Sequence, residues 1–399
     1  MEYKTYKLGT CFSLIENGAI IKQRKEAKGF PITRIETLSH GKFNRDKLGH
    51  ADIFDTTPYK RYILEDKDLI MSHINSRAFL GRTVLYRKKG NEQIIHGMNV
   101  LRIKTNEQFL DPVFASYLFK TSHFKKAIDS IRKDAINQSS INIFDICNIQ
   151  ISLPSITEQR KISHALQLID KKIETNHLIN DNLEAIAKQL YDYWFVQFDF
   201  PNEEGKPYKS SGGAMVWNEK LKREIPKEWM ASNYTDLFTI GNGQTMPQNE
   251  GLVPAYGGNG IVKMVEISNY PACIIIGRVG ANCGSIHYSK VPCWVSDNAI
   301  SICSKNDDWQ PFLFYSLKLY NLSKNKGGSS QPLITHEALK HLYFPMSEKH
   351  INQFCHIVNE LQDLIYSNQQ EILKLTKQRD ELLPLLMNGQ ATVNYHLLQ

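Results

Sequence analysis

A few residues in this sequence have the types and spacing of a catalytic centre. Asp55 and the run Glu65-Asp66-Lys67 follow the order Asp…Glu-x-Lys, which can hold a divalent cation for phosphodiester hydrolysis. That combination is frequent by chance and does not by itself establish a nuclease. Gly241 and Gly243 lack the third glycine of a dinucleotide-binding turn and the Lys-Ser/Thr of a phosphate-binding loop. The thirteen His residues show no His-x3-His or His-Glu-x2-His spacing, and no Asn-Pro-Pro-aromatic run of an amino-methyltransferase is present.

Four cysteines fall at intervals of ten residues: Cys273, Cys283, Cys293 and Cys303. Zinc sites usually take their ligands from close pairs such as Cys-x2-Cys. An interval of ten instead matches one strand and one turn of a β-meander. We therefore expect buried thiols here rather than a metal site.

Side chains that suit contact with double-stranded DNA form two groups. Lys and Arg neutralise phosphates, whereas Arg, Asn and Gln can form paired hydrogen bonds with base edges. The first group contains Arg24, Lys25, Arg34, Lys42, Arg45, Arg77, Arg82, Gln138 and Ser139. The second group lies in Gly-rich stretches, where the backbone can approach a ligand closely, and contains Gln244, Asn259, Arg278, Asn282, Ser329, Ser330 and Gln331. Each residue alone also fits ordinary surface or turn chemistry, so only the groups support a nucleic-acid interpretation.

The distribution of charge supports that interpretation for one part of the chain. The net charge is +7. Residues 1–153 hold 25 Lys and Arg against 16 Asp and Glu, a difference of +9, whereas residues 229–345 hold 8 against 7. A basic excess is the electrostatic signature of a nucleic-acid-binding domain. Charge thus favours DNA binding by the first segment and is uninformative for the second.

The elements that must position these residues repeat with a period near 200. Each half is a β-rich stretch followed by one long helix. Pro112 and Pro311 each open a short amphipathic helix, and Asn99-Val100-Leu101-Arg102-Ile103 resembles Asn298-Ala299-Ile300-Ser301-Ile302. We divide the chain into a first β-rich domain (1–153), a central helix (154–197), a linker rich in Pro, Gly, Ser and charge (198–226), a second β-rich domain (227–346) and a C-terminal helix and tail (347–399).

The two long helices carry heptad seams of apolar residues. The first is expected from Glu158, after an N-cap at Thr157, to about Phe195. The second is expected from about Lys349 to Leu383, where Pro384 would end it. The first seam contains Ile162, Leu166, Ile169, Ile173, Leu183, Ala187 and Leu190; the second contains Ile351, Phe354, Val358, Leu361, Ile365, Ile372, Leu375 and Leu382.

Polar residues interrupt both seams near the middle. Asn176 and Asn180 interrupt the first seam, Asn368 interrupts the second, and an offset of 192 superposes Asn176 on Asn368. If a pseudo-two-fold axis relates the halves, the helices pack antiparallel and Asn176 meets Asn368. Such a pair costs stability but fixes register. This predicts a pair of helices of defined length that acts as a ruler; an ordinary helical hairpin in a core is the alternative.

An aromatic cluster ends the first helix: Tyr191, Tyr193, Trp194, Phe195 and Phe198. We assign Tyr191, Trp194 and Phe195 as candidate anchors for a partner protein, since Trp and Tyr dominate interface hot spots. Packing between the helix and its domain explains the cluster equally well.

Several segments resemble the specificity-subunit family of type I restriction–modification systems. The clearest are Asn182-Leu183-Glu184 through Pro201, Glu224-Ile225-Pro226-Lys227-Glu228-Trp229 and Pro154 through Ile162. In the second half, Pro254 through Ile261, Ile276 through Gly280 and Gly328 through Pro332 also resemble the family. The resemblance covers nearly the whole chain. The second helix lacks the Pro-x-x-Glu-Gln opening and the first half lacks the Tyr-Gly-Gly-Asn turn, as expected if each half reads a different sequence.

The resemblance implies an α+β fold: two β-rich target recognition domains joined by two long antiparallel coiled-coil helices in a pseudo-two-fold internal repeat. It also implies that each domain reads one half of a split DNA site, and that the chain binds two methyltransferase subunits and restriction (motor-nuclease) subunits. S-adenosylmethionine, ATP and Mg would serve those partners, with no cofactor or metal in this chain and no catalytic residue.

Two other functions stay open as alternatives. A single-chain nuclease or DNA methyltransferase would act on DNA alone, and a coiled-coil scaffold would show no sequence-selective DNA binding. The chain has no apolar run of 18 residues and no apolar stretch at the N-terminus, so we expect a cytoplasmic protein without membrane contact.

Overall fold

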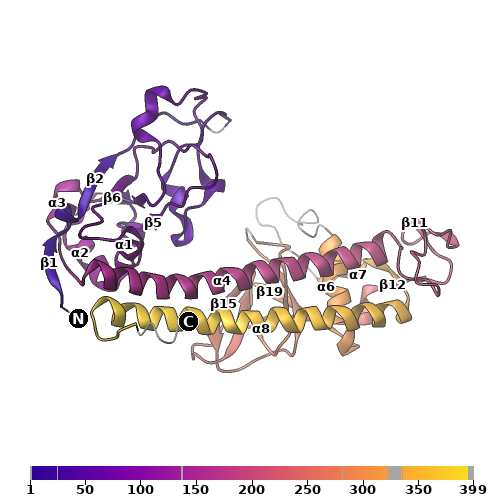
Figure 1. Cartoon of the computed structure of the whole chain (residues 1–399). Helices are drawn as coiled ribbons and strands as arrows, with labels where there is room; N and C mark the ends of the chain where they lie inside the picture. The colour runs from indigo at the N-terminus through magenta and orange to yellow at the C-terminus, as the bar shows by residue number, and fades with distance from the viewer. Residues whose placement is uncertain are drawn as a thin grey trace. The chain divides into compact units, whose positions relative to one another are not determined.

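The computed structural model describes residues 2–24, 26–135, 138–280, 282–320, 322, 334 and 336–393 (Figure 1). They form two compact units. Unit 1 contains Met1–Ile173 and Leu373–Gln399, and unit 2 contains Glu174–Ile372. Each unit therefore includes part of both long helices.

Unit 1 is built around a four-stranded antiparallel sheet with the strand order β2-β6-β3-β5. Strands β1 and β9 form a separate antiparallel pair, and β4, β8 and β7 form a small third sheet. The bounds are β1 (Lys4–Lys7), β2 (Phe12–Asn17), β3 (Leu69–Met71), β4 (Ile74–Asn75), β5 (Thr83–Leu85), β6 (Leu101–Thr105), β7 (Lys133–Asp134), β8 (Ser139–Ser140), β9 (Gln150–Leu153), α1 (Pro112–Leu118), α2 (Ser122–Ser130) and α3 (Ile143–Asn148). Short 3-10 helices are η1 (Leu8–Cys11), η2 (Ile35–Gly41), η3 (Arg45–Lys47), η4 (Thr57–Tyr62) and η5 (Arg77–Phe79).

Unit 2 contains a four-stranded antiparallel sheet with the order β13-β19-β16-β17. Strands β12 and β20 form a separate antiparallel pair, and β15-β14-β18 form a third sheet. The bounds are β10 (Met215–Asn218), β11 (Arg223–Pro226), β12 (Met230–Asn233), β13 (Phe238–Asn242), β14 (Val253–Gly257), β15 (Gly260–Val265), β16 (Cys273–Gly277), β17 (Ile286–Ser289), β18 (Trp294–Val295), β19 (Ala299–Ser304), β20 (Tyr343–Met346), α5 (Tyr234–Leu237), η7 (Asp307–Trp309), α6 (Gln310–Leu319) and α7 (His336–Lys340).

The two units share one plan, which confirms the internal repeat. In each four-stranded sheet the strands appear in the same spatial order, so β2, β6, β3 and β5 correspond to β13, β19, β16 and β17. Proline stands in the first turn of the helix that follows, α1 or α6, where its missing amide costs nothing. A further strand, β9 or β20, then precedes the long helix of each half.

The long helices are α4 (Ile156–Tyr191) and α8 (Glu348–Met387). Helix α4 begins two residues earlier than expected because the Ser155 hydroxyl, rather than Thr157, accepts a hydrogen bond from the Glu158 amide at 3.3 Å. At its other end, α4 continues into one π-helical turn, η6 (Asp192–Val196).

Pro384 does not end α8, contrary to our prediction. The helix runs on to Met387, and the Asn388 amide donates to the Pro384 carbonyl at 3.1 Å. Proline removes one hydrogen bond near the helix end, and burial of Leu386 and Met387 in the core of unit 1 offsets that loss.

The segment 198–226 is also not a simple linker. It contains the hairpin β10–β11, and Phe198 and Phe200 are buried in the main core of unit 2. Its Pro, Gly and charged residues form the turns of a folded element. The four regularly spaced cysteines lie in unit 2 as free thiols; Cys273, Cys283 and Cys293 are buried and Cys303 is half-buried.

Candidate nucleic-acid interface and helical scaffold

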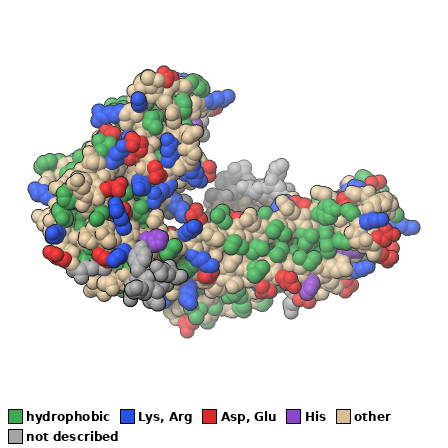
Figure 2. Space-filling view, in the orientation of Figure 1, with side chains coloured by type: hydrophobic (Ala, Val, Ile, Leu, Met, Phe, Trp, Pro, Cys, Tyr) green, Lys and Arg blue, Asp and Glu red, His purple; other side chains and the backbone are tan. Residues whose placement is uncertain are grey.

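In unit 1, five of the predicted DNA-contacting residues are exposed: Arg24, Arg34, Lys42, Arg77 and Gln138. Arg34 and Lys42 lie at the two ends of η2, as its N-cap and C-cap residues. The only ion pairs found for the exposed arginines among the described residues are loose, with Arg34 3.4 Å from Glu36 and Arg77 3.8 Å from Asp129. These cations remain largely available to phosphates. Figure 2 shows Lys and Arg side chains spread over the unit 1 surface.

Arg82 is half-buried beside the same 3-10 helix. Its Nη1 donates to the Leu38 carbonyl at 3.4 Å, and its guanidinium lies 4.2 Å from the centre of the Phe79 ring. Leu38 belongs to η2, so the structure places Arg82 near the segment that Arg34 and Lys42 flank. Unit 1 thus gathers part of the predicted group around one short helix.

Arg45 and Ser139 do not suit the role that the sequence predicted for them. Arg45 donates to both carboxylate oxygens of Glu92, at 2.9 and 2.5 Å, and this pair holds the pKa of Glu92 at about 2. The Ser139 side chain is buried and donates to Asp134 at 2.6 Å. Both residues are occupied by the fold of unit 1 and are not free to contact DNA. Lys25 lies outside the described residues.

In unit 2, the predicted residues Asn259, Arg278 and Asn282 come from two turns that pack together. The Ser285 hydroxyl donates to the Gly258 carbonyl, and a Cβ on Gly258 would lie 3.9 Å from the Cβ of Asn282. Asn259 and Asn282 are exposed and Arg278 is half-buried. The two amides and the guanidinium therefore lie on neighbouring turns of one unit.

Gln244 is exposed, and its backbone pairs with the segment around Ser296. A Cβ on the adjacent Gly243 would lie 1.7 Å from the Ser296 carbonyl oxygen, so only glycine permits this approach. Ser329, Ser330 and Gln331 lie outside the described residues.

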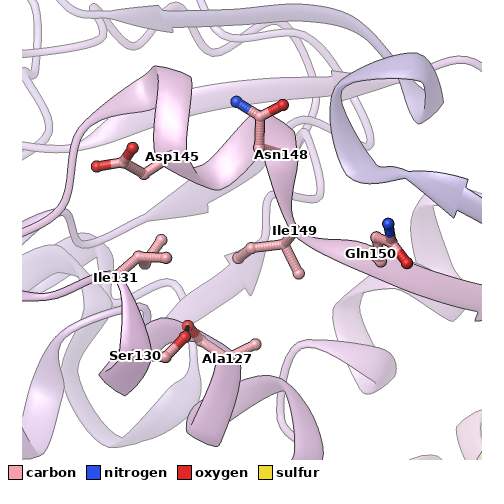
Figure 3. A pocket seen from close by; sticks show the side chains of 7 residues that line it. All are labelled: Ala127, Ser130, Ile131, Asp145, Asn148, Ile149 and Gln150. Carbon is pink, nitrogen blue, oxygen red and sulfur yellow. Dashed lines mark hydrogen bonds between the residues drawn. The ribbon is translucent and has the colours of Figure 1, made fainter.

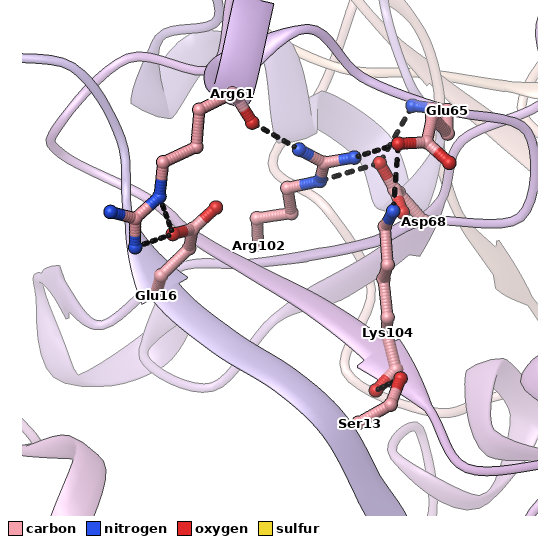
Figure 4. A network of polar contacts seen from close by, with 7 residues as sticks. All are labelled: Ser13, Glu16, Arg61, Glu65, Asp68, Arg102 and Lys104. Atoms are coloured by element: carbon pink, nitrogen blue, oxygen red, sulfur yellow. Dashed lines mark hydrogen bonds and ion pairs between the residues drawn. The ribbon is translucent and has the colours of Figure 1, made fainter.

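The nuclease-like carboxylates have structural partners; Figure 4 shows those of Glu65. Asp55 accepts hydrogen bonds from the amide and hydroxyl of Thr57, at 2.9 and 2.7 Å. Glu65 pairs with Lys104 at 2.8 Å and Arg102 at 3.3 Å. Within the described residues, no group of three or more His, Cys, Asp or Glu could hold a metal ion. Asp55 and Glu65 therefore each have polar partners within unit 1.

Arg102 is the centre of a buried polar network (Figure 4). Its side chain and that of Asp68 are 2% and 1% exposed, and their atoms are 2.7 Å apart. Arg102 also donates to the Arg61 carbonyl at 2.9 Å. Burial raises the pKa of Asp68 even though the guanidinium opposes that shift. The network ties β6 to the segment 61–68 within unit 1.

The depression shown in Figure 3 lacks a catalytic set. Ala127, Ile131, Ile149 and Gln150 form most of its lining, with Asp145 as its one carboxylate. Asp145 accepts from the Asn142 amide at 2.6 Å, and the Ser130 hydroxyl donates to the Ala127 carbonyl at 2.7 Å. With its serine turned to the backbone and a single acid, this pocket offers neither an activated nucleophile nor a pair of carboxylates.

Within unit 2, the C-terminal part of α4 lies antiparallel to the N-terminal part of α8. The Asn368 amide donates to Asn180 Oδ1 at 2.9 Å, and the Asn176 amide donates to Glu371 at 2.7 Å. Asn176 and Asn368 therefore do not pair with each other, contrary to our prediction. In this register the residue numbers of two facing positions add up to about 548. Leu178 and Gln370 satisfy both this sum and the offset of 192, so they mark the centre of the repeat. Residues equivalent by the offset of 192 meet only at that centre, and Asn176 lies half a turn before it.

Within unit 1, the first part of α4 packs against the end of α8. Asp170 accepts from Arg379 at 3.0 Å and from the Tyr117 hydroxyl at 2.6 Å. Gln159, fully buried, donates to the carbonyls of Phe109 and Pro154 and accepts from the Asp111 amide. Gln159 thus joins α4 to the start of α1. Sequence reasoning did not single it out, although it lies in the segment Pro154 through Ile162 that resembles the family.

The aromatic residues at the end of α4 are core residues. Tyr191, Trp194 and Phe195 are 2%, 6% and 1% exposed, and they pack against Phe312 and Phe354 of unit 2. Our prediction that these three anchor a partner is therefore wrong for this chain, because their side chains are buried in the core of unit 2. The packing alternative holds.

Exposed apolar residues instead lie elsewhere on the two helices, off the seam. In unit 2 they include Leu178, Ile179 and Ile186 of α4 and Ile357 and Leu364 of α8, each at least 40% exposed. Figure 2 shows hydrophobic side chains gathered where Figure 1 places these helices. Contiguous exposed apolar residues are typical of surfaces that bind other proteins. The signal was present in the sequence as apolar residues outside the heptad seam.

Comparison with known proteins identifies the family. The model of the type I restriction modification DNA specificity domain matches residues 1–185 and 226–382. The chain belongs to this family of type I specificity subunits. It is 27% identical over 98% of its length to a Methanocaldococcus jannaschii protein assigned as the MjaX type I restriction enzyme specificity subunit, with 94% of that protein covered.

Two further comparisons agree. The MjaIX specificity subunit of the same organism is 27% identical over 69% of this chain and 68% of its own length. The crystal structure of a type I restriction–modification S subunit from M. genitalium has the same fold, with a TM-score of 0.61, 18% identity and 96% of each chain covered. In the part of this specificity subunit that the structure describes, no helix is long and apolar enough to cross a membrane.

Proposed function

We propose that this specificity subunit reads a bipartite DNA site with a fixed spacer, one half-site by each unit. The observation that carries the proposal is the repeated four-stranded sheet followed by a long helix in each unit. Two similar but diverged domains suit two short, different half-sites. The exposed candidate residues differ accordingly: unit 1 offers mainly arginine and lysine, and unit 2 offers Gln244, Asn259 and Asn282, with Arg278 half-buried.

The exposed side chains of the two units differ in type, which supports phosphate contacts by unit 1 and base contacts by unit 2. Exposed cations such as Arg34, Lys42 and Arg77 suit phosphate oxygens, because each can neutralise one backbone charge. Amides such as those of Asn259 and Asn282 can donate and accept together at an adenine edge. The basic excess of residues 1–153 would therefore supply much of the affinity.

The helices would set the spacer. Helix α4 has 36 residues and α8 has 40, which at 1.5 Å per residue gives lengths of about 54 and 60 Å. One turn of B-DNA is roughly 34–36 Å, so such helices could hold two reading domains one to one and a half turns apart. The gap between the half-sites would then be unread and fixed in length.

Methyl transfer and cleavage would belong to other subunits. The exposed apolar residues of α4 and α8 suit two methyltransferase subunits, and restriction subunits would join that complex. S-adenosylmethionine, ATP and Mg would be used there, and this chain would contribute no catalytic residue.

Selection from random DNA duplexes tests this function. The purified chain, alone and with methyltransferase subunits, should retain duplexes that share two short blocks separated by a gap of constant length. A single continuous motif would contradict bipartite reading. Absence of any sequence preference would favour a scaffold without DNA recognition, and cleavage or methylation by the chain alone would favour the single-chain enzyme.

A further inference from the structure

In unit 2, the segment that follows α4 covers the end of that helix with aromatic side chains. Phe200 stacks on Trp229 with ring centres 5.0 Å apart, and Phe198 lies edge-on to the same ring at 5.5 Å. Arg223 of β11 donates to the Val196 carbonyl at 2.5 Å, and its guanidinium lies 4.5 Å from the centre of the Phe198 ring. Segment 198–226 is thus a cover over the end of α4.

The same cover extends over the strand pair β12–β20. Lys220, in the turn of the hairpin β10–β11, lies with its Nζ 5.2 Å from the centre of the Tyr343 ring on β20. Tyr343 also accepts a hydrogen bond at its carbonyl from the Tyr320 hydroxyl. The covered surface of unit 2 therefore consists of Trp229, Tyr343, Tyr320 and the last turn of α4.

The internal repeat identifies the equivalent surface in unit 1. Strands β1 and β9 correspond to β12 and β20, and Lys4 pairs with Leu153 as Met230 pairs with Met346. Tyr3, one residue before that pair, stands where unit 2 has Trp229. Gln150 stands where unit 2 has Tyr343, because Gln150 pairs with Lys7 at the far end of β1–β9 as Tyr343 pairs with Asn233 at the far end of β12–β20.

This surface of unit 1 is an open groove of about 740 Å³. Tyr3, Gln150, Thr121, Met387 and Asn388 contribute to its lining; the last two fall, by the offset of 192, at the positions of Phe195 and Val196. No Lys, Arg, Asp or Glu contributes to the lining. Residues 389–393, which the offset of 192 places at 197–201, lie beside Tyr3 and pack against the core of unit 1, but they contain no aromatic residue and do not line the groove. Among the described residues of unit 1, no hairpin like β10–β11 covers the groove.

We propose that the groove of unit 1 is a docking site for a segment of a partner protein that presents aromatic side chains. The counterpart in unit 2 indicates this chemistry, because there aromatic rings stack on the residue equivalent to Tyr3. The neutral lining argues against DNA, since phosphates would require cations. The proposal goes beyond DNA recognition and concerns a surface separate from the exposed apolar residues of α4 and α8.

The test uses the natural cover as its probe. A fluorescein-labelled peptide of residues 195–202, Phe-Val-Gln-Phe-Asp-Phe-Pro-Asn, is titrated with the full chain and followed by fluorescence anisotropy. We expect saturable binding that weakens at least tenfold when both Phe198 and Phe200 of the peptide are replaced by alanine. Equal binding of the alanine peptide would overturn the aromatic requirement, and absence of saturable binding would overturn the proposal.

Variants of the chain locate the binding. Ser152→Arg places a long cation in the groove from an exposed position on β9, and should weaken peptide binding at least tenfold. Ser13→Arg, an exposed serine on β2 outside the groove, is the matched control and should bind as the native chain does. If Ser152→Arg lowers the melting temperature, Thr5→Arg serves as the second groove variant.

Three results would overturn the assignment. One is unchanged binding by the groove variants, which would mean that the peptide binds elsewhere. The second is equal loss in Ser13→Arg. The third is peptide binding that appears only when the chain is truncated after Val393, because the chain's own C-terminal residues would then be the occupant of the groove. DNA selection is unaffected by any of these results, so failure here is distinct from failure of the proposed function.

Discussion

The hydrogen bond between Asn180 and Asn368 yields a prediction with a defined size. Asn180 is 7% exposed and accepts from Asn368 at 2.9 Å within unit 2. Asn368→Leu removes the donor and leaves the Asn180 amide buried without that partner, which costs about 1–3 kcal/mol. The double variant Asn180→Leu/Asn368→Leu replaces both polar groups by apolar ones, a change that can be neutral or stabilising.

Hydrogen exchange of the amides in residues 174–191 measures this locally, without requiring the two units to unfold together. A loss of about 1–3 kcal/mol corresponds to a roughly five- to 160-fold larger open population. We expect that increase in the single variant and native-like or stronger protection in the double variant. The reasoning is refuted if the single variant exchanges like the native chain, or if the double variant loses more protection than the two single variants combined.

Four further outcomes follow from the structure. Arg77→Ala should reduce the slope of log binding constant against log salt by about one, because one phosphate contact is lost, whereas Lys374→Ala on α8 should leave it unchanged; equal slopes would exclude Arg77 from the interface. Asp68→Ala should destabilise unit 1 by up to about 3–5 kcal/mol, because it removes the buried carboxylate partner of Arg102 and leaves only Glu65 at 3.3 Å, and adding Arg102→Leu should restore part of this; a loss below about 1 kcal/mol in urea titration would contradict the buried pair. Burial lowers the pKa of His96 to about 3, so below pH 6.5 the unfolded state binds a proton that the folded state does not, and this group alone should lower the unfolding free energy by up to about 1.4 kcal/mol per pH unit towards pH 3. In urea titrations at pH 7 and 5, His96→Gln should lose this share of the slope and keep the shares of His73 and His350, whose pKa burial lowers to about 4; an unchanged slope would contradict it. Inserting seven residues at facing positions of α4 and α8 lengthens each by about 10 Å and should lengthen the DNA spacer by up to about three base pairs; an unchanged spacer would refute the ruler.

The sequence was sufficient for the plan of the fold because that plan follows from periodic patterns. Pro112 and Pro311 marked equivalent helix starts, and both begin short helices in the structure. The seams of α4 and α8 were readable because heptad spacing places apolar residues on one face. The register of the pair was not readable from the offset alone, which superposes Asn176 on Asn368 but does not locate the centre of an antiparallel pairing.

Tertiary contacts decided the features that sequence could not. The aromatic residues Trp194 and Phe195 look the same in a sequence whether they face a partner or a core, and only the packing of unit 2 shows that they are buried in its core. Arg45 has the side-chain type that contacts phosphates. Its actual partner, Glu92, lies 47 residues away in the sequence, so the pairing could not be predicted from local spacing. Segment 198–226 was rich in turn residues, and the buried Phe198 and Phe200 make it a cover rather than a linker.

Mapping of methylated adenines tests the central claim most directly. The genome of cells that carry this chain with its methyltransferase partner is sequenced by a method that detects N6-methyladenine. Two-domain recognition predicts a motif of two short specific blocks separated by an unread gap of one length, with substitutions at Asn259 and Asn282 altering only the block read by unit 2. A continuous motif, a gap of variable length, or a change in both blocks would contradict it.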